Sequence, residues 1–193
     1  MRKLIVRMLV STDGHIADLK GDLRFGPHWS EQLQKSYAET FAALGGLIFG
    51  RTVFEKYVPY WESVAVNGRH PHSPATAAEV AYATQVKNLP KFVASRTLTE
   101  AADVTVLRGD VAASIATIKS EPGADLLLMC GPELLATLIA ADLIDEYLLD
   151  VYPVVIGRGV PLWRDLTEPQ ELEIAGEELF PGQVAVRRYV PKP

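Results

Sequence analysis

Hydrophobic residues occur along the chain in two alternating patterns. Short runs are apolar at nearly every position, which is typical of strands buried on both faces; longer stretches repeat an apolar residue every three or four positions, which is typical of helices. Because the two patterns follow each other from the first residues onward, they predict an α/β protein with a mixed, mainly parallel sheet and helices on both faces. The expected strands are residues 2–10, 47–49, 91–94, 104–107, 126–129 and 146–155.

Helices are expected between these strands. One runs from about Ser30 to Leu44, another begins at Arg51, and further helices cover 75–86, 110–120 and the stretch after 131. Serine and aspartate at the starts of two of them are common helix caps.

The segment from Pro59 to Pro74 is expected to be a long irregular stretch that precedes the helix at 75–86. It contains His70 and His72, whose spacing suits a metal, but no third ligand accompanies them. We therefore interpret this segment as a solvated loop and predict no metal site.

The chain ends in a predicted β-hairpin. Residues 172–179 and 184–190 alternate apolar and polar positions, and Pro181–Gly182 between them is a turn signal. The apolar positions of this hairpin form a long edge that is expected to be covered by a second copy of the chain. We predict a homodimer whose interface includes this hairpin or the strand at 146–155.

Composition narrows the class of protein. With 193 residues, 48% of them hydrophobic, the chain is expected to form a single domain over residues 1–193. A net charge of −5 and a pI near 5.4 disfavour nucleic-acid binding. No signal peptide or membrane-length apolar stretch is visible, and the single cysteine, interpreted as a buried packing residue, predicts a cytoplasmic protein.

Three of the predicted strands end in turns suited to a ligand. Gly131 follows the strand at 126–129 and opens a helix, where free backbone N–H groups attract phosphate. Gly50 follows a second strand and leads into Arg51, which is suited to phosphate, and Thr52, whose hydroxyl is a possible helix cap. Ser95, Arg96 and Thr97 follow a third strand. Because ligands of open α/β sheets bind at the carboxyl ends of strands, the three turns together predict a dinucleotide site.

The turns do not form a Rossmann fingerprint, since no strand is followed by the GxGxxG pattern. The glycines at 157 and 159 come late and are expected to shape a loop. Taken with the start of the chain, the turns resemble the dihydrofolate reductase-like family, and within it the single-domain proteins similar to the reductase half of the bacterial riboflavin-biosynthesis bifunctional enzyme. The resemblance spans nearly the whole chain, with landmarks at Val10–Ala17, Gly50–Thr52, Ser95–Thr97, Cys130–Gly131 with Leu134, and Leu143–Gly157.

The resemblance implies a dihydrofolate reductase-like three-layer fold and an NADPH cofactor. NADPH is preferred over NADH because Arg51, Arg96 and Ser95 are implied to converge on the adenosine end, where a 2′-phosphate needs cationic donors. Relatives usually carry a glycine pair where this chain has Cys130–Gly131, and by resemblance that peptide bond is expected to be cis. The implied cofactor-binding residues are Leu9, Ile16, Gly50, Arg51, Thr52, Ser95, Arg96, Thr97, Cys130, Gly131, Pro132, Glu133 and Leu134.

Substrate and catalytic residues are expected near the first strand and first helix, where the family places its substrate. Glu31 and Asp13 are the catalytic candidates, although a first-turn carboxylate facing solvent and a turn former are the alternative interpretations of the two. Asp22, His28 and Trp29 are further candidates. Aromatic residues suited to a flat heterocycle are Trp29, Tyr57, Tyr60 and Trp61.

We therefore predict an NADPH-dependent reductase of a small planar heterocycle, such as a pterin or a ribosylaminopyrimidine. The alternative is a non-catalytic nucleotide-binding or regulatory module that retains the fold. A hydrolase using the same crevice is disfavoured, because no serine or cysteine nucleophile belongs to a recognisable triad. Asp145 and Glu146 are expected to orient the adjoining strand and loops.

Overall fold

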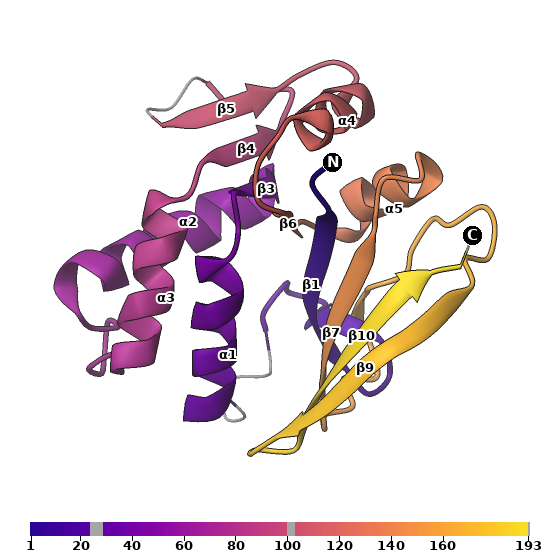
Figure 1. Ribbon diagram of the computed structural model, residues 1–193. Coiled ribbons are helices and arrows are strands. Elements are labelled where there is room, and N and C mark those ends of the chain that lie inside the picture. Colours follow the sequence, from indigo (N-terminus) through magenta and orange to yellow (C-terminus); the bar gives the residue numbers. More distant parts are fainter. Residues whose placement is uncertain (24–28, 100–102, 193) are drawn as a thin grey trace. The chain divides into compact units, whose positions relative to one another are not determined.

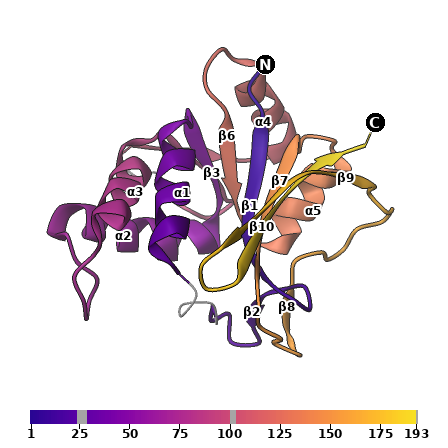
Figure 2. The ribbon, with the colours of Figure 1, turned by 60° about the horizontal axis from the view of Figure 1, so that its bottom comes forward.

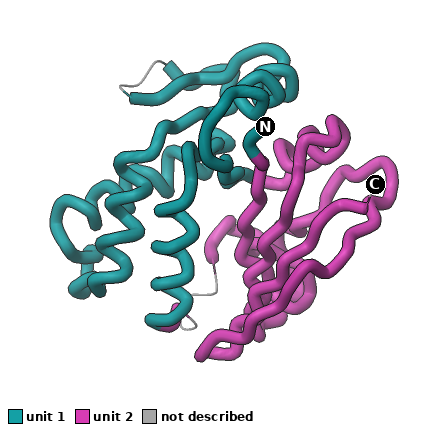
Figure 3. Tube along the Cα trace, viewed as in Figure 1, with its two compact units in different colours: residues 1–2, 31–130 teal, residues 3–30, 131–193 magenta. Residues whose placement is uncertain are grey.

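The computed structural model describes residues 1–23, 29–99 and 103–192. Within this range the chain forms two compact units, coloured separately in Figure 3: unit 1 contains residues 1–2 and 31–130, and unit 2 contains residues 3–30 and 131–193. Each unit has its own strands and helices. The single-domain prediction stays a prediction.

Unit 1 is built on four parallel strands. Their order is β5 (Val104–Leu107), β4 (Lys91–Ala94), β3 (Gly46–Gly50) and β6 (Leu126–Met129). The middle strand β3 is buried at Leu47, Ile48 and Phe49, as expected for a strand covered on both faces. Strand β3 therefore places its carboxyl end between those of two parallel neighbours.

Four helices belong to unit 1 (Figure 1): α1 (Glu31–Ala42), α2 (Arg51–Asn67), α3 (Ala77–Asn88) and α4 (Val111–Ser120). Helix α3 begins with a capping box between Thr76 and Glu79, and α4 begins at the expected cap Asp110. The rings of Phe41 and Tyr82 pack edge to face, with centroids 4.6 Å apart, which joins α1 to α3.

The prediction of an irregular stretch from Pro59 to Pro74 is wrong for its first half, because α2 continues through Pro59 to Asn67. Proline removes one helical hydrogen bond. Val58 and Val64 are buried on either side of it, so packing holds both halves of the helix in place. The helix ends at Gly68, which has the left-handed backbone (φ 65°) that favours glycine.

Unit 2 has a mixed sheet. Strand β1 (Leu4–Ser11) pairs in parallel with β7 (Glu146–Tyr152), which pairs antiparallel with β10 (Val184–Pro191). Strand β10 forms the predicted hairpin with β9 (Leu172–Phe180). The one helix described in this unit is α5 (Pro132–Ala140).

Unit 2 also contains a small strand pair that the pattern did not predict, β2 (His15–Asp18) with β8 (Gly159–Pro161), visible in Figure 2. These strands are too short to leave a periodic signal. Gly159 is required there, because a Cβ at this position would lie 2.1 Å from the Ala17 carbonyl oxygen. Strand β7 ends at Tyr152 instead of continuing to Val155, since Pro153 has no N–H to donate.

Candidate functional site

The carboxyl ends of three strands in unit 1 lie in register. Gly50 of β3 is paired with Ala94 of β4, and Ala94 is paired with Leu107 of β5. The residues that follow them, Arg51, Ser95 and Arg108, are therefore neighbours at one edge of the sheet. This is the edge at which open α/β sheets bind ligands.

Arg51 connects two of these turns. Its guanidinium donates through Nη1 to Thr97 Oγ1, and its Nε donates to Glu55 Oε1 at 2.8 Å. Helix α2 starts at Arg51 with Gly50 as its N-cap, and no side chain caps it. The predicted capping by Thr52 is therefore wrong. The N-terminal N–H groups of α2 have no side-chain cap, and no acidic residue lies in its first turn.

The turn after β4 is held by a serine and by an arginine that sequence reasoning missed. Ser95 is buried, and its Oγ accepts from the backbone N–H of Leu98 at 3.0 Å. Arg108 donates to the carbonyl oxygens of Leu98 at 2.7 Å and Arg96 at 3.3 Å. The Arg96 side chain is exposed and makes no hydrogen bond or ion pair with another described residue. Arg108 lies directly after a predicted strand, which was the available signal for finding it.

The turn after β6 carries a cysteine, a glycine and a proline instead of the arginines found after β3, β4 and β5. Cys130 is buried as predicted, and Gly131 is the N-cap of α5 without a side-chain cap. A Cβ at Gly131 would meet no atom within 4 Å, so the space beside this backbone is open. Pro132 is buried, while Glu133 is exposed and lies 3.2 Å from Arg164. No peptide bond among the described residues is cis, so the bond between Cys130 and Gly131 is trans and the predicted cis bond is wrong.

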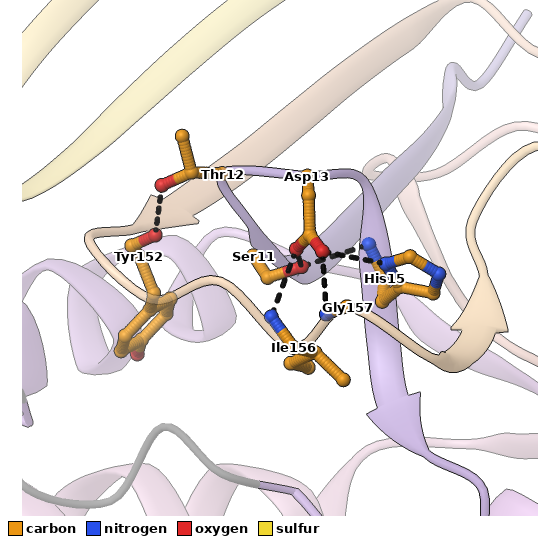
Figure 4. A network of polar contacts seen from close by, with 7 residues as sticks. All are labelled: Ser11, Thr12, Asp13, His15, Tyr152, Ile156 and Gly157. Carbon is orange, nitrogen blue, oxygen red and sulfur yellow. Dashed lines mark hydrogen bonds and ion pairs between the residues drawn. The ribbon is translucent and has the colours of Figure 1, made fainter.

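In unit 2, Asp13 holds the loop after β7 (Figure 4). Its carboxylate accepts from Ser11 Oγ at 2.6 Å and from the backbone N–H groups of Ile156 at 3.1 Å and Gly157 at 2.7 Å. The hydrogen bond from Ser11, followed by those from Ile156 and Gly157, holds the pKa of Asp13 far below its usual range. The carboxylate is therefore ionised at neutral pH and cannot donate a proton there.

The same loop explains one of the late glycines. Gly157 has a φ of 76°, which favours glycine, and it presents its N–H to Asp13. The expectation that these glycines shape a loop is confirmed at Gly157. Thr12 adds a second connection, since its Oγ1 donates to the Tyr152 carbonyl oxygen at 2.9 Å.

A buried ion pair crosses from β1 to β7 in unit 2. Arg7 Nε lies 3.2 Å from Asp150 Oδ2, and the exposed fractions of the two side chains are 2% and 0%. Tyr152 is also buried; burial and then the Asp150 charge raise its pKa. The orienting role predicted for Asp145 is confirmed by its carboxylate, which accepts from the Leu4 N–H at 2.7 Å.

The remaining candidates lie apart from these clusters. Glu31 is exposed on α1 and forms an ion pair with Lys35 at 3.0 Å, the solvent-facing arrangement considered as its alternative. Asp22 is exposed and Trp29 is half-buried, as are Leu9, Ile16 and Leu134. His28 lies outside the described residues.

The aromatic candidates of α2 form a cluster. Tyr57 and Trp61 pack with ring centroids 6.2 Å apart, and Tyr57 also contacts Phe49. The Tyr57 hydroxyl is buried and has no hydrogen-bond partner among the described residues. Buried hydroxyl groups are normally paired, so the Tyr57 hydroxyl is an exception among the described residues.

The strand arrangement and the strand-end turns define an α/β protein of the dihydrofolate reductase-like fold. The mixed, mainly parallel strands, the flanking helices and the C-terminal hairpin confirm the predicted fold class. The family model of the RibD C-terminal domain matches residues 2–186, and the chain belongs to this family.

A relative of similar length is YwjB of Bacillus subtilis (strain 168), an uncharacterized protein. It is 27% identical over 189 residues, which are 98% of each chain. The sequence similarity therefore extends over nearly the whole chain, but the name of this relative indicates no activity.

Three solved structures show the same fold. A riboflavin biosynthesis protein from Shewanella sp. PV-4 has a TM-score of 0.73 at 21% identity, with full coverage of both chains. The diaminohydroxyphosphoribosylaminopyrimidine deaminase/5-amino-6-(5-phosphoribosylamino)uracil reductase of Thermotoga maritima has a TM-score of 0.65 at 14% identity, covering 99% of this chain and 57% of that one. Dihydrofolate reductase of Enterococcus faecalis, complexed with NADP(H), has a TM-score of 0.61 at 15% identity, covering 99% and 97%.

Two further observations concern other classes of protein. In residues 1–23, 29–99 and 103–192, no helix is long and apolar enough to span a bilayer. The same residues contain no group of three or more metal-ligating side chains.

Proposed function

We propose that this protein is an NADPH-dependent reductase of a small planar heterocycle related to a pyrimidine or a pterin. The family supports a reductase, since the structures that share its fold include a 5-amino-6-(5-phosphoribosylamino)uracil reductase and a dihydrofolate reductase. The observation that carries the proposal is the cationic edge of unit 1, where Arg51, Arg96 and Arg108 follow three strands in register.

This edge fits the 2′-phosphate of NADPH. Arg96 is exposed without a partner among the described residues, and Arg51 is held by Thr97 and Glu55 in an exposed position. The start of α2, which has no side-chain cap, adds backbone N–H groups whose partial positive charge also attracts phosphate. NADH has a hydroxyl group where NADPH has this phosphate, so the cations favour NADPH.

The bound cofactor supplies the hydride, and the chain supplies binding and orientation. We propose that Gly131 and the first turn of α5 bind the pyrophosphate, because a Cβ at Gly131 meets no protein atom and backbone N–H groups open the helix there. Leu9, Ile16 and the other residues implied by resemblance remain part of this proposal.

For the substrate we propose the aromatic cluster of α2. Tyr57 and Trp61 present flat faces, and the unpaired Tyr57 hydroxyl offers a hydrogen bond to a ring substituent. Trp29 and Asp22 remain candidates for the same role. Of the catalytic candidates, Glu31 has an exposed carboxylate, whereas Asp13 is committed to the loop after β7.

The test compares NADPH and NADH binding to Arg51→Ala and Arg96→Ala. A charge-assisted hydrogen bond contributes about 1.5–3 kcal/mol, so each variant is expected to bind NADPH about tenfold or more weakly while NADH binding stays nearly constant. Lys87→Ala, which removes an exposed cation at the end of α3, is the matched control. Equal losses for both cofactors would refute the assignment.

Turnover separates the reductase from the alternative, a nucleotide-binding module without activity. NADPH oxidation is measured with a panel of pterins and aminopyrimidines. If the protein is a reductase, NADPH is oxidised only when one of these compounds is present. If it is a binding module, it binds NADPH but none of the compounds causes NADPH oxidation. The proposed setting is the cytoplasm, where the free thiol of Cys130 stays reduced.

We also propose a homodimer, with β9 as the contact. Strand β7 has strands on both sides, so its backbone is already paired, whereas β9 pairs with β10 on one side and with no other strand of the described residues. Ile174 and Leu179 on β9 are exposed by 63% and 64%. Light scattering at micromolar concentration is expected to give twice the mass of the 21.2 kDa chain. A monomer mass would overturn the proposal, and Ile174→Lys is expected to shift the dimer toward that mass.

A further inference from the structure

A phenol, an imidazole and a carboxylate form a chain of two polar contacts in unit 1. They come from Tyr60 on α2, His70 in the loop after α2, and Glu79 on α3. The Tyr60 hydroxyl is 2.7 Å from His70 Nδ1, and His70 Nε2 is 3.2 Å from Glu79 Oε2. This corrects the interpretation of His70 as part of a solvated loop, since its side chain is only 16% exposed.

The imidazole is held on several sides. Its ring stacks on Tyr60, with centroids 5.8 Å apart and planes 20° apart, and it meets the edge of Trp61 at 5.9 Å. The backbone of the loop is closed by the His70 N–H, which donates to the Ser73 carbonyl oxygen at 2.8 Å. The orientation of His70 is therefore set by packing as well as by its polar contacts.

The carboxylate is also fixed. Glu79 is 7% exposed, and its Oε2 accepts from the Thr76 N–H at 2.8 Å in the capping box of α3. Thr76 in turn donates through Oγ1 to Gln34 Oε1 on α1 at 2.6 Å. An ionised carboxylate can only accept, so the proton of neutral His70 belongs on Nε2 and Nδ1 is free to accept from Tyr60.

This is the order of groups found in nucleophilic enzymes: a hydroxyl, a base within hydrogen-bond reach of it, and a third group that orients the base. A cavity of about 220 Å³ lies beside it, and Tyr60 and His70 are part of its wall. Val64 and Pro71 give the wall an apolar part, and Arg69 provides a cation. The cavity therefore suits a small, mostly apolar molecule with an oxygen that becomes negatively charged.

We propose that this cavity is an acyl-transfer site in which Tyr60 is the nucleophile, His70 the general base and Glu79 the positioning residue, and that its substrates are small activated esters. Tyr60 Oη forms a bond to the carbonyl carbon of the ester while its proton moves to His70 Nδ1. The bond to the leaving oxygen then breaks, and that oxygen takes the proton from His70. Water hydrolyses the acyl-tyrosine in the second half-reaction, which returns the acid and free Tyr60.

The chemistry of the phenol limits the substrates. Burial and the nearby Glu79 charge raise the pKa of Tyr60, so its hydroxyl depends on His70 to remove the proton at neutral pH. A phenolate displaces only leaving groups that are less basic than itself, which selects aryl esters over alkyl esters. This site is separate in its residues from the proposed cofactor edge at Arg51 and Arg96.

The experiment uses the full chain without cofactor and p-nitrophenyl acetate as the probe. Release of p-nitrophenolate is followed by absorbance, and the acetylated residue is identified by peptide mass spectrometry. We expect acetyl on Tyr60 and a release rate about tenfold or more lower in Tyr60→Phe, which keeps the ring stacking. Tyr189→Phe, which removes a phenol hydroxyl from β10 in unit 2, is the matched control and is expected to match the unmodified protein.

Two further variants distinguish catalysis from a structural role. Glu79→Gln keeps an oxygen that can accept from Thr76 but loses the charge, and it is expected to slow acetylation of Tyr60 while leaving the melting temperature nearly unchanged. His70→Gln removes the general base and is expected to slow acetylation about a hundredfold. Acetyl on a lysine or serine instead of Tyr60, or equal rates in Tyr60→Phe and the unmodified protein, would overturn the proposal. So would unchanged acetylation of Tyr60 in Glu79→Gln.

Discussion

The strand ends of the two units use charge in opposite ways. In unit 1, Arg51 and Arg96 follow parallel strands and remain exposed, and the guanidinium of Arg96 has no partner among the described residues. In unit 2, the carboxylate at the end of β1, Asp13, is occupied by three hydrogen bonds, and Arg7 is buried against Asp150. The charge at these strand ends of unit 1 is exposed to solvent, whereas Asp13 and Arg7 in unit 2 hold segments of the fold together.

The difference follows from where each charge lies. A buried ion cannot be left without a partner, because the protein interior solvates it poorly. An exposed cation beside a helix N-terminus keeps its water and can exchange it for a phosphate oxygen. The same residue type, arginine, therefore has a structural role at position 7 and a proposed binding role at positions 51 and 96.

The largest effect is expected from breaking the buried pair of unit 2. Asp150→Asn removes the carboxylate charge that lies 3.2 Å from the buried Arg7 guanidinium and is expected to lower the free energy of unfolding by about 3–5 kcal/mol. Urea unfolding followed by circular dichroism measures this loss. Glu55→Gln removes one member of the exposed pair with Arg51 and is expected to change the same quantity by about 0.5 kcal/mol or less. Similar losses in both variants would remove the contrast between the units.

A smaller effect, on NADPH binding, is expected from replacing Arg108. This variant tests whether every cation at the strand ends of unit 1 contacts the cofactor directly. Arg108 donates to the carbonyl oxygens of Arg96 and Leu98, so it holds the turn that carries Arg96. Arg108→Ala is expected to weaken NADPH binding about threefold to tenfold, less than the loss of a direct charged hydrogen bond to the phosphate, because Arg108 acts through the position of the turn. Isothermal titration measures the affinity. A loss as large as that of Arg96→Ala would show that Arg108 contacts the phosphate itself.

The smallest effect, on thermal stability, is expected from replacing Asp13, because its carboxylate is partly exposed and its charge is screened by solvent. Its pKa is lowered in the folded state, chiefly by Ser11 and then by Ile156 and Gly157. Because this pKa is lowered, the Asp13 carboxylate stabilises the fold fully at pH values above the usual carboxyl pKa of about 4. This stabilisation is lost as the pH falls toward the pKa that Asp13 has in the folded state. Asp13→Asn is expected to unfold at a lower temperature than the unmodified protein at pH 7.

The pH series for Asp13 includes its own check. The difference in melting temperature between Asp13→Asn and the unmodified protein is expected to narrow as the pH falls below about 4. Asp22→Asn is the control, because the Asp22 carboxylate is exposed and accepts no hydrogen bond from another described residue, and this variant is expected to show little difference at any pH. A difference for Asp13→Asn that stays constant with pH would mean that the charge is not what holds the loop.

The sequence by itself determined the order and type of most elements. The ranges of β4 and β5 agree with the predicted runs at 91–94 and 104–107, and Asp110 caps α4 as expected. These features depend on neighbouring residues, because burial on both faces and helix capping leave their signal within a few positions. The glycine that ends β3, Gly50, and the serine that follows β4, Ser95, were predictable for the same reason.

Only the tertiary structure decided which side chains meet. The partner of Arg7 is 143 positions away, and His70 acquires its role because α2 continues through Pro59 and returns the loop to Glu79 on α3. The sequence indicated that Asp13 could form a turn, but its contacts with Ile156 and Gly157 depend on the pairing of β1 with β7. Such contacts leave no local pattern, because they are set by the packing of segments that are distant in the chain.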